Sequence, residues 1–173
     1  MMELQKAKVI AEELKSLLEP ACEREPAIAG SIRRQKPNVG DVELVCIPRF
    51  VDGVDQLDKK LGGLCIQGVL GLRRNKRGSA VYGPKNKLMV HLPSGIGVDI
   101  FSTDERCWWV ALAIRTGPKE SNIAIARAAQ RKGWRLRAYG SGFDTPNGGR
   151  IECRAERAVF EAVGLPYQPP ERR

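Results

Sequence analysis

Histidine, paired cysteines and long apolar runs are almost missing from this chain of 173 residues. His91 is the only histidine, and because it lies in an apolar run we expect a strand residue rather than a catalyst or metal ligand. The five cysteines contain no C-x-x-C pair, which predicts reduced thiols rather than a zinc site or a disulfide framework. No segment approaches the roughly 18 apolar residues of a membrane span, and the N-terminus lacks a signal peptide. We therefore expect an intracellular protein that binds no membrane.

Acidic residues are absent between Asp58 and Asp99, although cations are frequent there. The chain as a whole carries a formal net charge of +9. A concentrated positive charge favours a polyanionic partner such as nucleic acid, while a solvated loop is the plainer interpretation of the cluster taken alone. The cations of this stretch are Lys59, Lys60, Arg73, Arg74, Lys76, Arg77, Lys85 and Lys87.

The apolar periodicity predicts an α+β fold with two lobes. At this length the chain can form one ordinary core, or two small lobes that share a cleft. We expect helices over 4–18, 51–61, 107–117, 118–133 and 156–163, and strands within 27–47 and over 66–72, 79–82, 87–92, 97–101, 134–139 and 150–153. The change to a helix-led pattern after Thr103 predicts an α+β lobe over residues 1–103 and a smaller, helix-led α+β lobe over 104–173, with the site between them.

Two carboxylates alternate in one predicted strand. Asp41 and Glu43 are two residues apart, so both side chains leave the same face of the strand, while Val42 and Leu44 face the core. Like charges this close repel each other unless a cation lies between them. The same alternation occurs in many half-exposed strands, so the pattern needs support from neighbouring residues.

A predicted anion site precedes these acids. Gly30 lets the backbone approach a ligand closely, and the hydroxyl of Ser31 adds to the N–H groups of a turn or helix start. Arg33 and Arg34 follow directly and supply positive charge for the same anion. These features together predict a phosphate-binding turn.

A third carboxylate, Asp99, lies in a later predicted strand. Because side chains alternate along a strand, Asp99 lies on the face opposite to Val98 and Ile100. If this strand lies beside the one that carries Asp41, three carboxylates converge. Clustered oxygen ligands suit Mg²⁺, and two such ions can promote the in-line displacement of pyrophosphate. The pattern therefore predicts phosphoryl transfer.

The same residues resemble a known family. Gly30-Ser31, then Asp41-Val42-Glu43, then Val98-Asp99-Ile100 resemble the signature of the nucleotidyltransferase superfamily. The later motifs resemble the carboxyl-terminal lobe of family X DNA polymerases, the group of DNA polymerase beta. These motifs are Arg115-Thr116-Gly117, Asn122, Arg131-Lys132-Gly133-Trp134, Tyr139-Gly140 and the ending 159–167. The resemblance spans about residues 25 to 173.

The resemblance implies a nucleotidyltransferase-type palm with a mixed or antiparallel sheet and packed helices, and a metal-dependent DNA polymerase that fills short gaps or processes ends in repair. It implies Asp41, Glu43 and Asp99 as catalytic ligands of two Mg²⁺ ions, for which Mn²⁺ can substitute. Its implied partners are primer–template or gapped DNA and a dNTP, bound by a monomer. The implied nucleotide contacts are Gly30, Ser31, Arg34, Gly40, Thr116, Gly117 and Asn122. The implied DNA contacts are Arg73, Arg74, Lys76, Arg77, Lys85, Lys87, Arg127, Arg131 and Lys132.

Several positions depart from the family pattern. Glu43 stands where these polymerases mostly have aspartate, and Gly97 where they often have arginine. Ile114-Arg115 replaces an aromatic pair that helps to select deoxyribose. Only one helix precedes the palm, as in the minimal viral polymerases of this family. Two alternatives therefore stay open: template-independent nucleotidyl transfer to RNA, protein or a small molecule, and a non-catalytic nucleic-acid-binding module.

Overall fold

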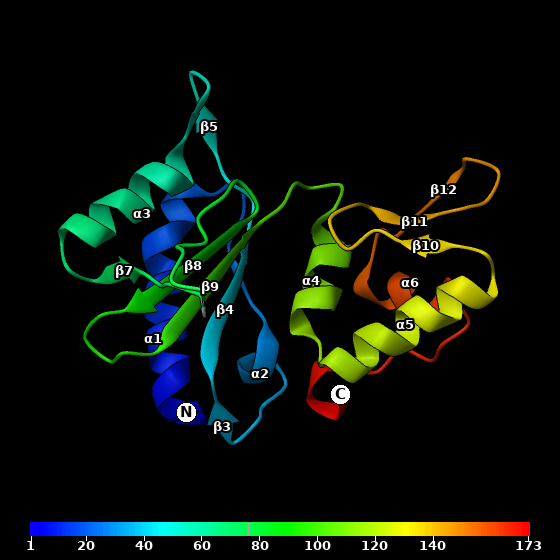
Figure 1. Ribbon diagram of the computed structural model, residues 1–173, viewed down its shortest axis with the longest axis horizontal. Coiled ribbons are helices and arrows are strands. Elements are labelled where there is room, and N and C mark those ends of the chain that lie inside the picture. Colours follow the sequence, from blue (N-terminus) through cyan, green and yellow to red (C-terminus); the bar gives the residue numbers. More distant parts are fainter. Residues whose placement is uncertain (76) are drawn as a thin grey trace.

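The computed structural model describes residues 1–75 and 77–173 and has two lobes joined by the segment 103–107 (Figure 1). The first lobe is built on a five-stranded mixed sheet with the strand order β2-β4-β9-β8-β7. The central strands β4 and β9 are parallel, and the other neighbours are antiparallel. Its strands are β2 (Ala27–Ile28), β4 (Asp41–Cys46), β9 (Gly97–Ser102), β8 (Asn86–His91) and β7 (Leu70–Leu72).

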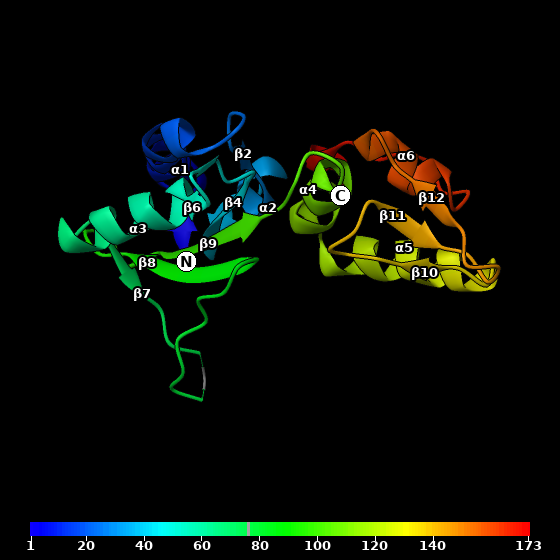
Figure 2. The same cartoon turned by 90° about the horizontal axis from the view of Figure 1, so that it is seen from above.

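Two helices cover one face of this sheet, α1 (Leu4–Leu18) and α3 (Gln56–Ile66) (Figure 2). The apolar stripe of α1 is buried against Val42 and Leu44 of β4 and Val98 of β9. Because side chains alternate along a strand, burying these residues leaves Asp41, Glu43 and Asp99 on the opposite face. The hydrophobic core therefore determines which face carries the acids.

Short elements complete the first lobe and surround its sheet. They are β1 (Met2–Glu3), η1 (Glu19–Ala21), α2 (Gly30–Arg33), β3 (Asn38–Val39), β5 (Phe50–Val51) and β6 (Val54–Asp55). The most important for the site is α2, which precedes β4 and lies beside it.

The second lobe has its own hydrophobic core, in which Ile125, Phe143 and Val159 are fully buried. Three helices pack with a small antiparallel sheet of order β10-β11-β12. Its elements are α4 (Trp108–Thr116), α5 (Lys119–Arg131), β10 (Arg135–Leu136), β11 (Gly142–Asp144), β12 (Arg150–Glu152), α6 (Glu156–Glu161) and η2 (Pro170–Arg172). A third apolar cluster, with Val45 of β4 and Trp108 and Leu112 of α4, packs the lobes together.

Most predicted elements are present, and the helix predicted over 51–61 is partly wrong. Its first residues form the hairpin β5–β6 instead, because Asp52 and Gly53 adopt positive φ angles of 50° and 77° that suit a tight hairpin turn. The helix then starts after Asp55, whose side chain accepts a hydrogen bond from the backbone N–H of Asp58.

Three predicted strands are also wrong in extent. Of the strand predicted over 134–139, only β10 forms. Residues 66–69 belong to the end of α3 and to a turn, so the strand that follows is only β7. Residues 79–82 form no regular strand and contribute only single bridges, Arg74 with Ala80 and Tyr82 with Lys87. His91 lies buried on β8, where its ring nitrogen Nδ1 is 2.8 Å from the hydroxyl of Ser94, and all five cysteines are free. Among the described residues, no helix is both long and apolar enough to cross a membrane.

Candidate active site

The register of β4 and β9 brings the predicted carboxylates together on one face. Asp41 pairs with Gly97 and Glu43 with Asp99, so the four residues form a compact square on adjacent parallel strands. Neighbouring strands are about 4.8 Å apart, which places Glu43 and Asp99 within strong electrostatic range of each other. The condition for convergence of the acids, that the two strands are neighbours, is thus met.

The proximity of these acids shows in their protonation. Burial, followed by the charges of Asp41 and Asp99, raises the pKa of Glu43 from 4.5 to about 7. Burial and the charge of Asp41 raise the pKa of Asp99 from 3.8 to about 6, against the opposing charge of Arg73. A cation bound beside such carboxyl groups would stabilise their ionised forms and lower their pKa values.

The three carboxylates do not converge on one point in this conformation. Among the described residues, no group of three acidic, histidine or cysteine side chains is placed to hold a metal ion. The carboxylate of Glu43 lies against Gly30, where an added Cβ would be only 1.5 Å from Oε2. The carboxylate of Asp99 forms an ion pair with Arg73. In this conformation two of the acids thus face other partners, and the role of the three as metal ligands stays a prediction.

The turn before β4 has the features expected of a phosphate site. Gly30 begins α2 with a φ of 58°, and its missing side chain makes room for Glu43. The hydroxyl of Ser31 and the Nε of Arg34 are buried and have no hydrogen-bond partner. Buried polar atoms are normally paired, so these two retain unused hydrogen-bonding capacity. Gly40 is exposed between β3 and β4.

A pocket of about 520 Å³ lies between the lobes beside these groups. Arg34, Gly117 and Asn122 line it together with Glu43, so three of the predicted nucleotide contacts share one cavity with a predicted metal ligand. The amide of Asn122 donates to the carbonyl of Ile114 (2.8 Å), while its own Oδ1 is buried without a partner. The pocket is thus lined by the cationic side chains of Arg34, Arg115 and Lys119, which suit an anionic ligand.

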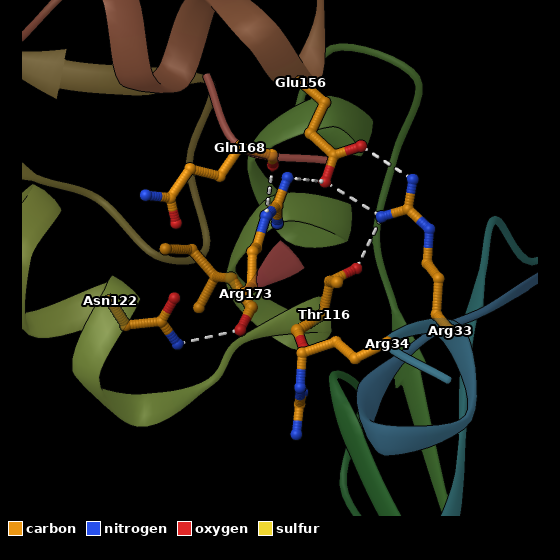
Figure 3. Close-up of polar contacts among 8 residues, drawn as sticks. Arg33, Arg34, Thr116, Asn122, Glu156, Gln168 and Arg173 are labelled. Carbon is orange, nitrogen blue, oxygen red and sulfur yellow. Dashed lines mark hydrogen bonds and ion pairs between the residues drawn. The ribbon is translucent and has the colours of Figure 1, made fainter. Parts of the chain in front are cut away.

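Arg33 and Thr116 have structural roles that the sequence did not indicate (Figure 3). Arg33 donates two hydrogen bonds to the carboxylate of Glu156 (2.9 and 2.7 Å) and one to the hydroxyl of Thr116 (2.6 Å). Arg173 donates to the same carboxylate (2.8 Å), and Arg34 donates to the carbonyl of Thr116. The prediction that Arg33 binds the anion is wrong because Glu156 occupies its guanidinium. Thr116 is fully buried below the pocket, so of the predicted pair only Gly117 lines it.

Arg115 is a site residue whose only signal in the sequence is a departure from the family pattern. Its guanidinium packs on the ring of Phe101 (3.9 Å to the centroid) and faces Tyr139 of the second lobe (5.2 Å). It also lines the pocket, and its charge lowers the pKa values of both Glu43 and Asp99. The replacement of an aromatic residue by arginine was the signal that could have identified it.

The basic loop between β7 and β8 projects from the sheet on the face opposite the covering helices (Figure 2). Arg74, Arg77 and Lys85 are exposed there, as a DNA-binding role requires, and Lys76 lies outside the described residues. Lys87 is the exception, because it is completely buried. Its ammonium donates to the carbonyl of Gly83 (3.0 Å) and lies near Ser102 and Asp58. The prediction that Lys87 contacts DNA is therefore wrong, since it secures the base of the loop.

The predicted DNA contacts of the second lobe are at the surface. Arg127 and Arg131 are exposed on α5, and Lys132 follows at its end. Lys132 donates to the carbonyl of Ala162 (2.7 Å) and lies over the ring of Trp134. A contact between these residues and DNA stays a prediction.

Comparison with known proteins defines the class of the fold. Residues 111–173 match the protein family DNA polymerase beta thumb. A structure of Leishmania infantum polymerase beta in a ternary P/T complex is similar over 98% of this chain and 75% of that chain, with 22% identity and a TM-score of 0.78. The ternary gap complex of the same polymerase is similar over 98% of this chain and 69% of that one, with 21% identity and a TM-score of 0.81. No curated protein matches the chain.

The fold is thus α+β, with a mixed sheet and packed helices, and it matches that of the polymerase beta structures. The second lobe matches the thumb family of DNA polymerase beta, and the chain shares the fold of the polymerase beta structures over nearly all of its length. The family resemblance and the fold class predicted from the sequence are both confirmed.

The Glu156 contacts predict a large effect of a small substitution. Glu156→Gln keeps the shape of the side chain but leaves Arg33 and the buried Arg173 without their shared counter-charge. We expect the free energy of unfolding to fall by about 3 kcal/mol in urea denaturation. The control is Glu161→Gln, which removes an exposed pair with Arg157 and should cost less than about 0.5 kcal/mol. Equal effects of the two substitutions would show that Glu156 is not a stabilising contact between the lobes.

The raised pKa values predict how stability depends on pH. In the metal-free folded protein, Glu43 keeps its proton up to about pH 7, whereas in the unfolded chain it loses the proton near 4.5. Stability must therefore fall as the pH rises between these values, because the folded state binds more protons there. The free energy of unfolding can be measured by urea denaturation at pH 5 and at pH 7.5, with a chelator present. Its decrease between the two pH values should be smaller for Glu43→Gln than for the wild type. An unchanged fall in this variant would contradict the assignment.

Proposed function

We propose that the chain is a DNA-directed DNA polymerase that transfers a nucleotidyl group from a dNTP to a primer 3′-hydroxyl, in short-gap filling or end processing during repair. The observation that carries this proposal is the square of Asp41, Glu43, Gly97 and Asp99 beside the pocket between the lobes. The similarity of the whole chain to polymerase beta structures supports it. We also propose the division into a palm over residues 1–103 and a carboxyl-terminal lobe over 104–173.

The proposed metal ligands are Asp41, Glu43 and Asp99, and the proposed ions are two Mg²⁺, for which Mn²⁺ can substitute. Carboxylate oxygens are the ligands that these hard ions prefer, and burial together with repulsion between the acids raises the pKa values of Glu43 and Asp99, an effect that a bound cation would offset. When bound, such ions activate the attacking hydroxyl and stabilise the leaving pyrophosphate.

Side chains and backbone groups of the protein would position the nucleotide. The proposed phosphate contacts are the unpaired hydroxyl of Ser31 and the guanidinium of Arg34, with the backbone at Gly30 and Gly40 nearby. Gly117 would leave room for the sugar, and the unpaired acceptor of Asn122 would face the base. Holding the triphosphate and primer in line contributes to the rate by reducing the entropy lost on reaching the transition state.

The proposed DNA contacts are the exposed cations of the loop and of α5. Because phosphate contacts are electrostatic, binding to gapped duplex should weaken as salt concentration rises. The two groups belong to different lobes and are Arg74, Arg77 and Lys85 in the first, and Arg127, Arg131 and Lys132 in the second.

The test is extension of a labelled primer on a one-nucleotide-gapped duplex with Mg²⁺, offering each dNTP and rNTP separately. We expect addition directed by the template base, and a loss of about a thousandfold or more in Glu43→Gln and Asp99→Asn, because metal ions supply several kcal/mol of transition-state stabilisation. Asp52→Asn, in the exposed turn of β5–β6, is the matched control and should retain activity.

Other outcomes distinguish the alternatives. Addition that ignores the template, yet is lost in both variants, would assign the same chemistry to another acceptor. Binding of DNA with no addition to any acceptor would identify a non-catalytic module and contradict the proposal.

A further inference from the structure

Gly97 leaves an open space at the centre of the carboxylate face, and Arg73 fills it. Gly97 pairs with Asp41 and lies two residues before Asp99 on β9. A Cβ added to Gly97 would be 2.0 Å from Nη1 of Arg73 and 3.4 Å from the Cβ of Asp41. The guanidinium therefore occupies the place that any side chain at position 97 would need.

Arg73 reaches this place from the edge of the sheet that is formed by β7. It follows β7, and its backbone N–H donates to the carbonyl of Leu88 on β8 (3.0 Å). From there its side chain crosses β8 and forms both a hydrogen bond and an ion pair with Asp99 on β9. The two side chains are 31% and 15% exposed, so water screens their attraction only partly. This is a specific contact and not a loose surface pair.

The contact with Asp99 gives Arg73 a different role from that of the neighbouring cation Arg74 in the basic loop. The guanidinium of Arg74 donates to the carbonyl of Gly78 (2.6 Å) and is exposed. Arg73 instead points away from the loop and toward the acids. Of these two adjacent arginines, one belongs to the loop and the other to the carboxylate face.

We propose that Arg73 is a positioning residue that serves as a displaceable counter-ion of Asp99, holding this carboxylate until a divalent cation takes it. The inference rests on the proposed function, since it assumes that the acids bind metal. Two cations only a few ångströms apart repel each other, so a divalent ion held by Asp41 and Asp99 and a guanidinium above Gly97 cannot both be favourable. Occupation by the ion requires the Arg73 side chain to turn away.

The proposal predicts that removal of Arg73 strengthens metal binding, whereas ordinary structural damage would weaken it. Mn²⁺ binding to the free protein, without DNA or nucleotide, can be measured by electron paramagnetic resonance. We expect Arg73→Ala to lower the Mn²⁺ Kd by about tenfold, which corresponds to about 1.4 kcal/mol. Arg74→Ala removes the same charge from the adjacent position and should leave the Kd nearly unchanged.

Gly97→Ala tests the geometry without removing the arginine. The added methyl clashes with the far end of a flexible side chain and makes an ordinary contact with the Cβ of Asp41, so it should displace the guanidinium and leave the fold intact. We expect tighter Mn²⁺ binding here too, and no additional gain when Gly97→Ala is combined with Arg73→Ala, because both substitutions remove the same contact. Circular dichroism checks the fold of each variant.

The outcomes separate failure of the inference from failure of the proposed function. Suppose that the wild-type protein binds Mn²⁺ and that Asp41→Ala abolishes this binding. If the Arg73→Ala variant then binds Mn²⁺ no more tightly than the wild type, Arg73 is not a counter-ion that the metal displaces. If neither the wild type nor Arg73→Ala binds Mn²⁺ through Asp41, the carboxylates are not a metal centre, and both proposals are wrong.

Discussion

The parallel pairing of β4 with β9 is the constraint on which the rest of the site depends. Its register places Glu43 beside Asp99 and Asp41 beside Gly97, and the burial of Val42 and Val98 against the helices holds the acids on the open face. A shift of one residue in either strand would move its acids into the core. The hydrophobic core and the proposed chemistry are thus two consequences of one alternating pattern.

Arginine side chains surround the acids and connect the two lobes. Arg73 and Arg115 approach Asp99 from different elements, and Arg34, directly after α2, approaches Glu43. Arg115 also contacts aromatic rings of both lobes, while Arg33 joins α2 to Glu156 of the second lobe. Arg34 and Arg115, which approach the carboxylates, thus also contact the second lobe.

The sequence was informative where local spacing decides the outcome. Two-residue alternation places Asp41 and Glu43 on one face whatever the partner strand is, so this part of the site could be predicted. The burial of Lys87 and the contact of Arg73 with Asp99 could not, because they depend on where a long loop meets the sheet. The hairpin β5–β6, where a helix was predicted, has a related cause. The apolar spacing there suits either a helix or a strand, and the geometry of the turn decides for the hairpin.

The most direct test of the central claim is anomalous diffraction from crystals grown with Mn²⁺, gapped DNA and a non-hydrolysable dNTP. The account predicts two Mn²⁺ ions roughly 3.5–4 Å apart, ligated by Asp41, Glu43 and Asp99, with the triphosphate against α2. A complex that binds nucleotide and DNA but places its Mn²⁺ ions away from the β4–β9 face would contradict it.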